Sequence, residues 1–228
     1  MTTLQPWIAE FDSVRRSLVD MGAKRLIHQA HLKRLNERRF DDGTGIVHRW
    51  MQESYADSML MGLRRILDNN RGSFSLVRLL GNLERNAALF SFDGYLKLWV
   101  GQQADIDEEF ARALYTRYST DGKTINRRRI QEDVKALLVR GKTVLRYVNT
   151  VVAHDSASVV NSTPAVAITW ADLDKLFDEV TALFNKYYGL VRPGVHVDFA
   201  PVLPAGFEQA FNRMIEGPAN QRMEPTRH

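Results

Sequence analysis

The sequence contains no cysteine, which excludes disulfide bonds and thiolate metal sites. It has no apolar run approaching the roughly 20 residues that span a bilayer. Its start, MTTLQPWIAEFDSVRR, places polar and acidic residues before any apolar segment develops, unlike a secretory signal peptide. We therefore expect a cytoplasmic protein without a membrane partner.

Common catalytic signatures are also missing. The patterns GxxxxGKS/T, GxGxxG, HExxH and GxSxG do not occur, so the usual nucleotide-binding, metalloprotease and hydrolase motifs are excluded. His28 and His31 have a spacing that suits two metal ligands on one helix face, but no third ligand lies near them in the sequence. We interpret them as polar surface histidines and expect neither a metal nor a cofactor.

The remaining composition is that of a globular protein. Of 228 residues, 44% are hydrophobic and 25% charged, and the net charge of +4 is a mild bias that assists contact with phosphate without identifying a ligand.

Five of the seven prolines follow Gly189. We expect one domain over residues 1–190 and an irregular arm over 191–228, helical only at 207–215 and disordered in its last dozen residues.

Apolar residues recur at helical spacing through most of the chain, which predicts an all-α antiparallel bundle of about five main helices. The expected helices cover residues 4–39, with a kink or break near Gly22, then 46–68, 75–90, 130–155 and 169–191, with two shorter pieces within 92–119. Thr169 and Asp172 form a capping-box pattern. The second helix is expected to bury Trp50, Met51, Tyr55, Met59, Leu63, Ile66 and Leu67.

Charged residues gather at two helix starts. Residues 107–109 are all acidic, and capping with a favourable dipole explains them more simply than a catalytic carboxylate pair. Residues 127–129 are all arginine and oppose the helix dipole, so an offsetting partner is required. Glu132 and Asp133 are the simplest partners, and a bound phosphate is the alternative.

The helix predicted over residues 130–155 is the organising element. One apolar face runs through it for about seven turns, from Ile130 to Val152. Cations, an amide, a hydroxyl and an imidazole lie off that face, at Arg140, Lys142, Arg146, Asn149, Thr150 and His154. His154 also has a structural interpretation, as a helix-end histidine bonded to a terminal carbonyl, and Asp155 either orients that imidazole or pairs with an arginine.

Two segments resemble the HEPN superfamily, in its AbiU-like branch. LRYVNTVVAHDS at residues 145–156 is similar to the motif helix of that superfamily, in which four to six residues stand between an Arg and a His. The stretch from Trp50 to Leu80 is similar to the second helix and Ser-Leu turn of the AbiU-like branch, which is named for abortive phage infection. The resemblance covers residues 45–188 and implies a helical bundle.

The resemblance further implies metal-independent RNA cleavage, or RNA binding, by a homodimer whose motif helices face each other. His154 matches the family His and Asn149 the polar residue after the family Arg, which places Val148 at the Arg position. Arg146 is the nearest substitute, roughly 12 Å along the axis and about 80° around it from His154, so Arg146 of one copy would have to approach His154 of the other. Arg140, Lys142 and Thr150 are the expected RNA contacts.

Three functions follow from these observations. The first is an endoribonuclease of the phage-defence or toxin type, with an antitoxin or defence-system protein as a further partner. The second is a catalytically degenerate HEPN-like module that binds RNA, a nucleotide or a protein, which Val148 favours. The third is a structural helical protein without salt-dependent RNA binding.

Overall fold

The computed structural model describes residues 4–37, 45–70, 73–100, 107–149, 168–200, 206, 207 and 209. Within them the chain forms seven α-helices and a 3-10 turn, with no β-strand, which confirms the predicted all-α bundle. The helices are α1 (Gln5–Glu37), α2 (Gly45–Leu67), α3 (Leu76–Arg85), α4 (Phe92–Val100), α5 (Glu108–Tyr115), α6 (Arg127–Tyr147) and α7 (Trp170–Tyr188), with η1 (Ala87–Leu89) after α3.

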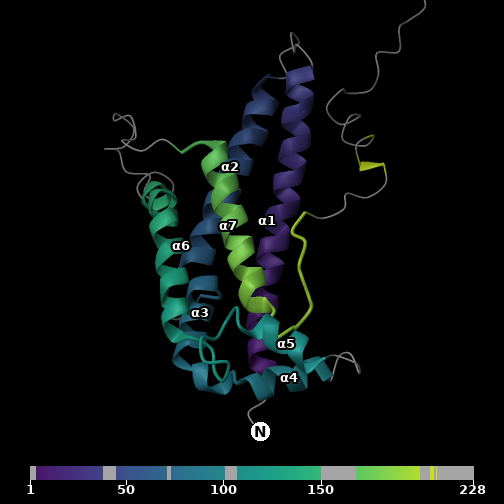
Figure 1. The fold of residues 1–228 in the computed structure, drawn as a ribbon. Coiled ribbons are helices and arrows are strands. Elements are labelled where there is room, and N and C mark those ends of the chain that lie inside the picture. Colours follow the sequence, from purple (N-terminus) through teal and green to yellow (C-terminus); the bar gives the residue numbers. More distant parts are fainter. Residues whose placement is uncertain are drawn as a thin grey trace, which may run out of the picture.

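The four long helices α1, α2, α6 and α7 run side by side along the length of the molecule (Figure 1). The shorter α4 and α5 cross the base, near the N-terminus (Figure 1). The C-terminal end of α6 and the N-terminal end of α7 both point away from the base, and α1 and α2 extend beyond them (Figure 1). None of the helices within the described residues is long and apolar enough to span a membrane.

The helix starts carry the side-chain caps that their sequences favour. Thr169 and Asp172 form the predicted capping box of α7. Asp107 accepts from the amide of Glu109 at 3.0 Å at the start of α5, which confirms that residues 107–109 begin a helix. Ser75 accepts from the amide of Arg78 at 3.1 Å and begins α3.

The helix does not break at Gly22, because α1 is continuous from Gln5 to Glu37. Gly22 instead permits a close approach of the segment that follows α7. A Cβ built there would lie 1.7 Å from the carbonyl oxygen of Phe199. Phe199 packs its ring edge-on against Phe184 with centroids 5.5 Å apart, so this segment is held against both α1 and α7.

Most of the C-terminal arm cannot be compared with its prediction. The arm helix expected over 207–215 and the disorder expected in the last dozen residues lie outside the described residues, apart from 207 and 209. The described part of the arm up to residue 200 includes buried Val191 and Phe199.

Candidate nucleic-acid interface on α6

The positive charges of the arginines at the start of α6, which oppose the helix dipole, are offset by other groups of the protein. Arg129 donates to the carbonyls of Thr116 and Arg117 at 3.0 and 2.8 Å, and Arg127 donates to the carbonyl of Arg85 at 3.1 Å. Arg128 pairs with Glu132 at 2.9 Å. Two of the three guanidinium groups thus bind backbone carbonyls and the third binds the carboxylate that the sequence predicted, so a phosphate is not needed to explain them.

Asp133, the other predicted partner, has a different role. Its carboxylate accepts from the hydroxyl of Tyr187 at 2.6 Å and pairs with Lys186, both on α7. Burial, followed by this hydrogen bond, raises the pKa of Tyr187, so the phenol stays protonated. Asp133 therefore joins α6 to α7.

One face of α6 is buried in the bundle. Gly141 lies against α2, since a Cβ there would lie 2.5 Å from a methyl carbon of Leu67. The helix continues through a π-type turn at Val148 and Asn149. The buried residues of this face are Ile130, Leu137, Gly141, Val144 and Val148.

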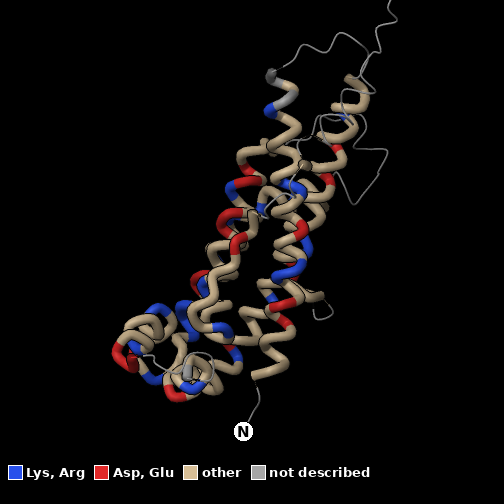
Figure 2. Tube along the Cα trace, turned by 90° about the vertical axis from the view of Figure 1, so that its right-hand side faces the viewer, with Lys and Arg blue, Asp and Glu red and all other residues tan. Residues whose placement is uncertain are grey.

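The opposite face of α6 carries a line of exposed side chains, which we call the α6 stripe. Its members recur at alternating intervals of four and three residues, which places them on one side of a helix. From Val134 to Asn149 the sequence has four basic residues and no acidic residue, whereas basic and acidic residues are interspersed along most of the chain (Figure 2). The α6 stripe consists of Lys135, Val139, Lys142, Arg146 and Asn149.

The structure separates the predicted site residues. Lys142, Arg146 and Asn149 are exposed together on the α6 stripe. Arg140 is also exposed but lies toward α7, where it pairs with Glu179 at 3.4 Å. A cavity of about 270 Å³ beside that pair is lined from α7 by Asp172, Lys175, Leu176 and Glu179. Arg140 is therefore partly engaged within the protein.

Val148 is fully buried, with 0% of its surface exposed, as its place on the apolar face predicted. The position that the resemblance aligns with the family Arg thus belongs to the core. Thr150 and His154 lie outside the described residues, so the distance from Arg146 to His154 remains a prediction.

Comparison with known families decides what kind of bundle this is. Residues 4–204 match the family HEPN_AbiU2, described as AbiU2. The chain belongs to the AbiU2 family of HEPN proteins. No curated protein and no solved structure matches it. Membership confirms the AbiU-like resemblance and identifies an abortive-infection type of HEPN protein, and the matched range includes α6 and the α6 stripe.

This AbiU2 protein also contains a buried histidine cluster, so the prediction that His28 and His31 lie on the surface is wrong. His28 and His31 are buried, with 6% and 1% of their surfaces exposed, and His48 of α2 joins them with its ring centroid 5.0 Å from that of His31. The signal was present, because His28 continues the buried line of α1 through Leu18 and Met21. Within the described residues, no group of three or more histidines and carboxylates is arranged to hold a metal ion.

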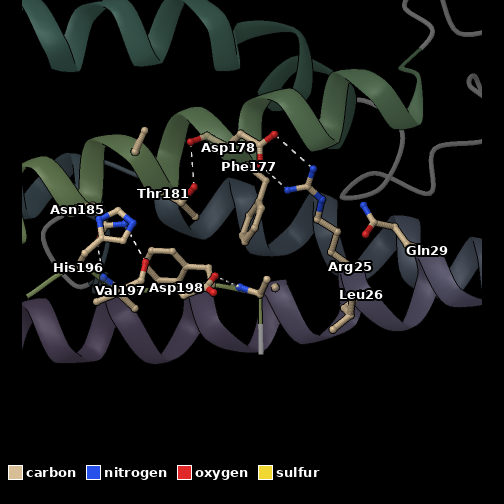
Figure 3. Close-up of a pocket in the computed structure, with 14 residues that line it drawn as sticks. Arg25, Leu26, Gln29, Phe177, Asp178, Thr181, Asn185, His196, Val197 and Asp198 are labelled. Atoms are coloured by element: carbon tan, nitrogen blue, oxygen red, sulfur yellow. Dashed lines mark hydrogen bonds and ion pairs between the residues drawn. The ribbon is translucent and has the colours of Figure 1, made fainter. Parts of the chain in front are cut away.

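A polar cavity of about 490 Å³ lies between α1, α7 and the segment after α7 (Figure 3). Arg25 points across it to α7, where it pairs with Asp174 at 2.9 Å and also with Asp178. The side chain of Asn185 exchanges two hydrogen bonds of 2.9 Å with the backbone of Val197. These groups hold α1, α7 and the arm together, so we assign them a structural role.

Proposed function

We propose that this AbiU2 protein binds RNA along the α6 stripe and cleaves it, without a metal ion, as a homodimer. The observation that carries the proposal is the exposure of Lys142, Arg146 and Asn149 on one side of α6, just before the segment that contains His154. Guanidinium and ammonium groups bind phosphate through charge-assisted hydrogen bonds. An amide can contact a base edge or a ribose hydroxyl.

The proposed reaction needs only groups of this chain. A neutral His154 takes the proton of a ribose 2′-hydroxyl, and the 2′-oxygen attacks the adjacent phosphorus. The bond from phosphorus to the 5′-oxygen breaks, the imidazolium formed on His154 gives its proton to that oxygen, and the product carries a 2′,3′-cyclic phosphate. Arg146 stabilises the negative charge that develops on the phosphate oxygens.

The charge of the α6 stripe supports a link between RNA binding and dimerisation. Two copies that meet through this face would bring Lys142 and Arg146 of one copy toward the same cations of the other. Like charges repel, and an RNA phosphate between them would offset that repulsion. The exposed Val139, with 65% of its surface accessible, would supply an apolar contact at the middle of the stripe.

A second candidate function is RNA binding without cleavage. Val148 favours it, because a guanidinium at the family Arg position would have to enter a fully buried site. In that case Arg140, Lys142, Arg146 and Thr150 contribute only to binding. An antitoxin or a defence-system protein stays a predicted partner in both cases.

The test is RNA cleavage by the purified protein in the presence of a chelator. We expect a product with a cyclic phosphate end, lost in His154→Ala and strongly reduced in Arg146→Ala. Arg16→Ala on α1 is the matched control, since it removes an exposed arginine from a different helix. Intact RNA that is nevertheless bound tightly would select the binding function, and absence of salt-dependent binding would contradict both.

A further inference from the structure

A cavity of about 280 Å³ opens between the halves of α1 and α2 that lie farthest from the base of the bundle. It contains no residue of α6. Its walls are mostly apolar, and Ile27 and Met51 face it from the two helices. Pockets of this kind, apolar with a few convergent polar groups, are typical of small-molecule sites. The lining residues are Lys24, Ile27, His28, His31, Met51, Ser54, Tyr55 and Ser58.

The floor of this cavity is a fixed group of aromatic rings. His28 stacks on Tyr55 with ring centroids 3.9 Å apart and planes within 11° of parallel. Trp170, the first residue of α7, lies against both rings at 4.6 and 5.5 Å. Trp170 is not among the lining residues, so it packs against His28 and Tyr55 without lining the cavity, and packing leaves Nε2 of His28 and the hydroxyl oxygen of Tyr55 with almost no accessible surface.

Two buried polar atoms of this floor lack a hydrogen-bond partner in the part of the chain that the structure describes. They are Nε2 of His28 and the hydroxyl oxygen of Tyr55, in side chains that are 6% and 8% exposed. An unsatisfied buried polar atom costs about 1–3 kcal/mol. Native structures contain few of them, so each calls for an explanation.

Both groups are uncharged at neutral pH. Burial, and then the neighbouring His31, lowers the pKa of His28 to about 4. Burial, and then the negative charge of Asp174, raises the pKa of Tyr55 well above its ordinary value, although Arg25 acts against that shift. The one cation among the lining residues, Lys24, is half-exposed and pairs with Asp20 at 2.7 Å. An anionic ligand would therefore meet no buried cation.

We propose that this cavity binds an uncharged, planar aromatic molecule that carries a hydrogen-bonding group, with phenol and indole as the simplest probes. The ring would fill the apolar space beside Ile27 and the polarizable thioether of Met51. A small displacement of the ring of His28 or Tyr55 would let the polar group of the ligand reach Nε2 of His28 or the hydroxyl of Tyr55, which packing covers. A molecule without a polar group would leave both atoms unsatisfied. This site goes beyond the proposed RNA function.

The direct test is the imidazole NMR spectrum of the wild-type protein during titration with indole and with phenol. We expect saturable shifts of the His28 resonance. His196 is the internal control, because it is exposed beside the polar cavity at α7 and should not move. Cyclohexanol, which is aliphatic, and benzoate, which is anionic, should bind at least tenfold more weakly than phenol, a gap of about 1.4 kcal/mol.

Two variants at the cavity and one control variant locate the site. Ser54→Trp places a large side chain at the exposed rim and should weaken indole binding at least tenfold, whereas Ser17→Trp at an exposed serine of α1 should leave it unchanged. His28→Phe keeps the ring and removes the nitrogen, so it should weaken phenol binding by about fivefold, as expected for one hydrogen bond. Melting temperatures of all three verify folding.

Several results would overturn the proposal. One is the absence of a saturable His28 shift at millimolar probe, and another is that cyclohexanol or benzoate binds as tightly as phenol. A third is an equal loss of indole affinity in Ser54→Trp and Ser17→Trp. Because the cavity contains no residue of α6, aromatic binding can fail while RNA cleavage is retained, and the reverse. The two outcomes are therefore distinguishable.

Discussion

Arg146 in the last turn of α6 and Val148 in the π-type turn that continues it are two residues apart but point to opposite sides of the helix. Arg146 is exposed on the α6 stripe, and Val148 is fully buried in the core. Two helical residues at this spacing lie about 200° apart around the axis. For the proposed RNA binding, the exposed guanidinium nearest to His154 in the sequence is therefore that of Arg146, and placing one at Val148 conflicts with folding.

The same substitution at a buried and at an exposed valine tests this geometry. Val148→Arg should cost about 3–5 kcal/mol of unfolding free energy, because it buries an unpaired charge. Val139→Arg lies on the α6 stripe and should change stability by less than about 0.5 kcal/mol. Urea denaturation measures both. A stable Val148→Arg protein with raised nuclease activity would show that position 148 can reach the site.

RNA affinity should depend on Arg146 through a phosphate contact. Removing one such contact in Arg146→Ala should weaken binding and reduce the slope of log affinity against log salt by about 1. Fluorescence anisotropy with a short RNA over a range of salt measures the slope. The exposed Arg16→Ala should leave the slope unchanged. A lower affinity with an unaltered slope would indicate that Arg146 makes no ionic contact.

Acid should destabilise the fold through His28. Its pKa is lowered to about 4 from an unfolded value of 6.5, so the unfolded chain binds more protons between these pH values and stability falls as pH decreases through that window. At about 1.4 kcal/mol per pKa unit, the loss across this window is on the order of 3–4 kcal/mol. Denaturation at several pH values measures it. His28→Phe should flatten this part of the profile, and an unchanged profile would contradict the assignment.

The contact between α1 and the arm should depend on the glycine at position 22. Gly22→Ala forces the carbonyl of Phe199 away and should cost about 1–3 kcal/mol. Gly81→Ala is the matched control, because its Cβ would meet nothing within 4 Å, and it should stabilise α3 by up to about 1 kcal/mol. Urea denaturation compares the two. Equal stability of both variants would show that the Phe199 contact contributes little.

The fold was largely predictable because most of its helices bury a regular apolar face. Helix starts were also predictable where a cap such as Thr169 identifies them. The prediction that Trp50 of α2 is buried is wrong, because 64% of its surface is exposed. Trp50 lies about 140° around α2 from the buried Tyr55. In the N-terminal half of α2 the buried residues are His48 and Tyr55.

The candidate site was predictable only in part. The helical periodicity correctly predicted that Arg146 and Asn149 are exposed and that Val148 is buried. It could not reveal that Arg140 pairs with Glu179, because that contact joins helices whose relative placement the sequence does not specify. The buried histidines were missed for a different reason. Histidine is polar, which suggested a surface position, whereas the spacing of these histidines continues the line of buried apolar residues on α1.

The most direct test of the central claim is RNA cleavage, in chelator, by a mixture of the His154→Ala and Arg146→Ala proteins after subunit exchange. If Arg146 of one copy acts with His154 of the other, each variant alone is inactive and the mixture regains one intact site per heterodimer. The account predicts cleavage by the wild type and by the mixture, with a cyclic phosphate product. RNA left intact by the wild-type protein would contradict it.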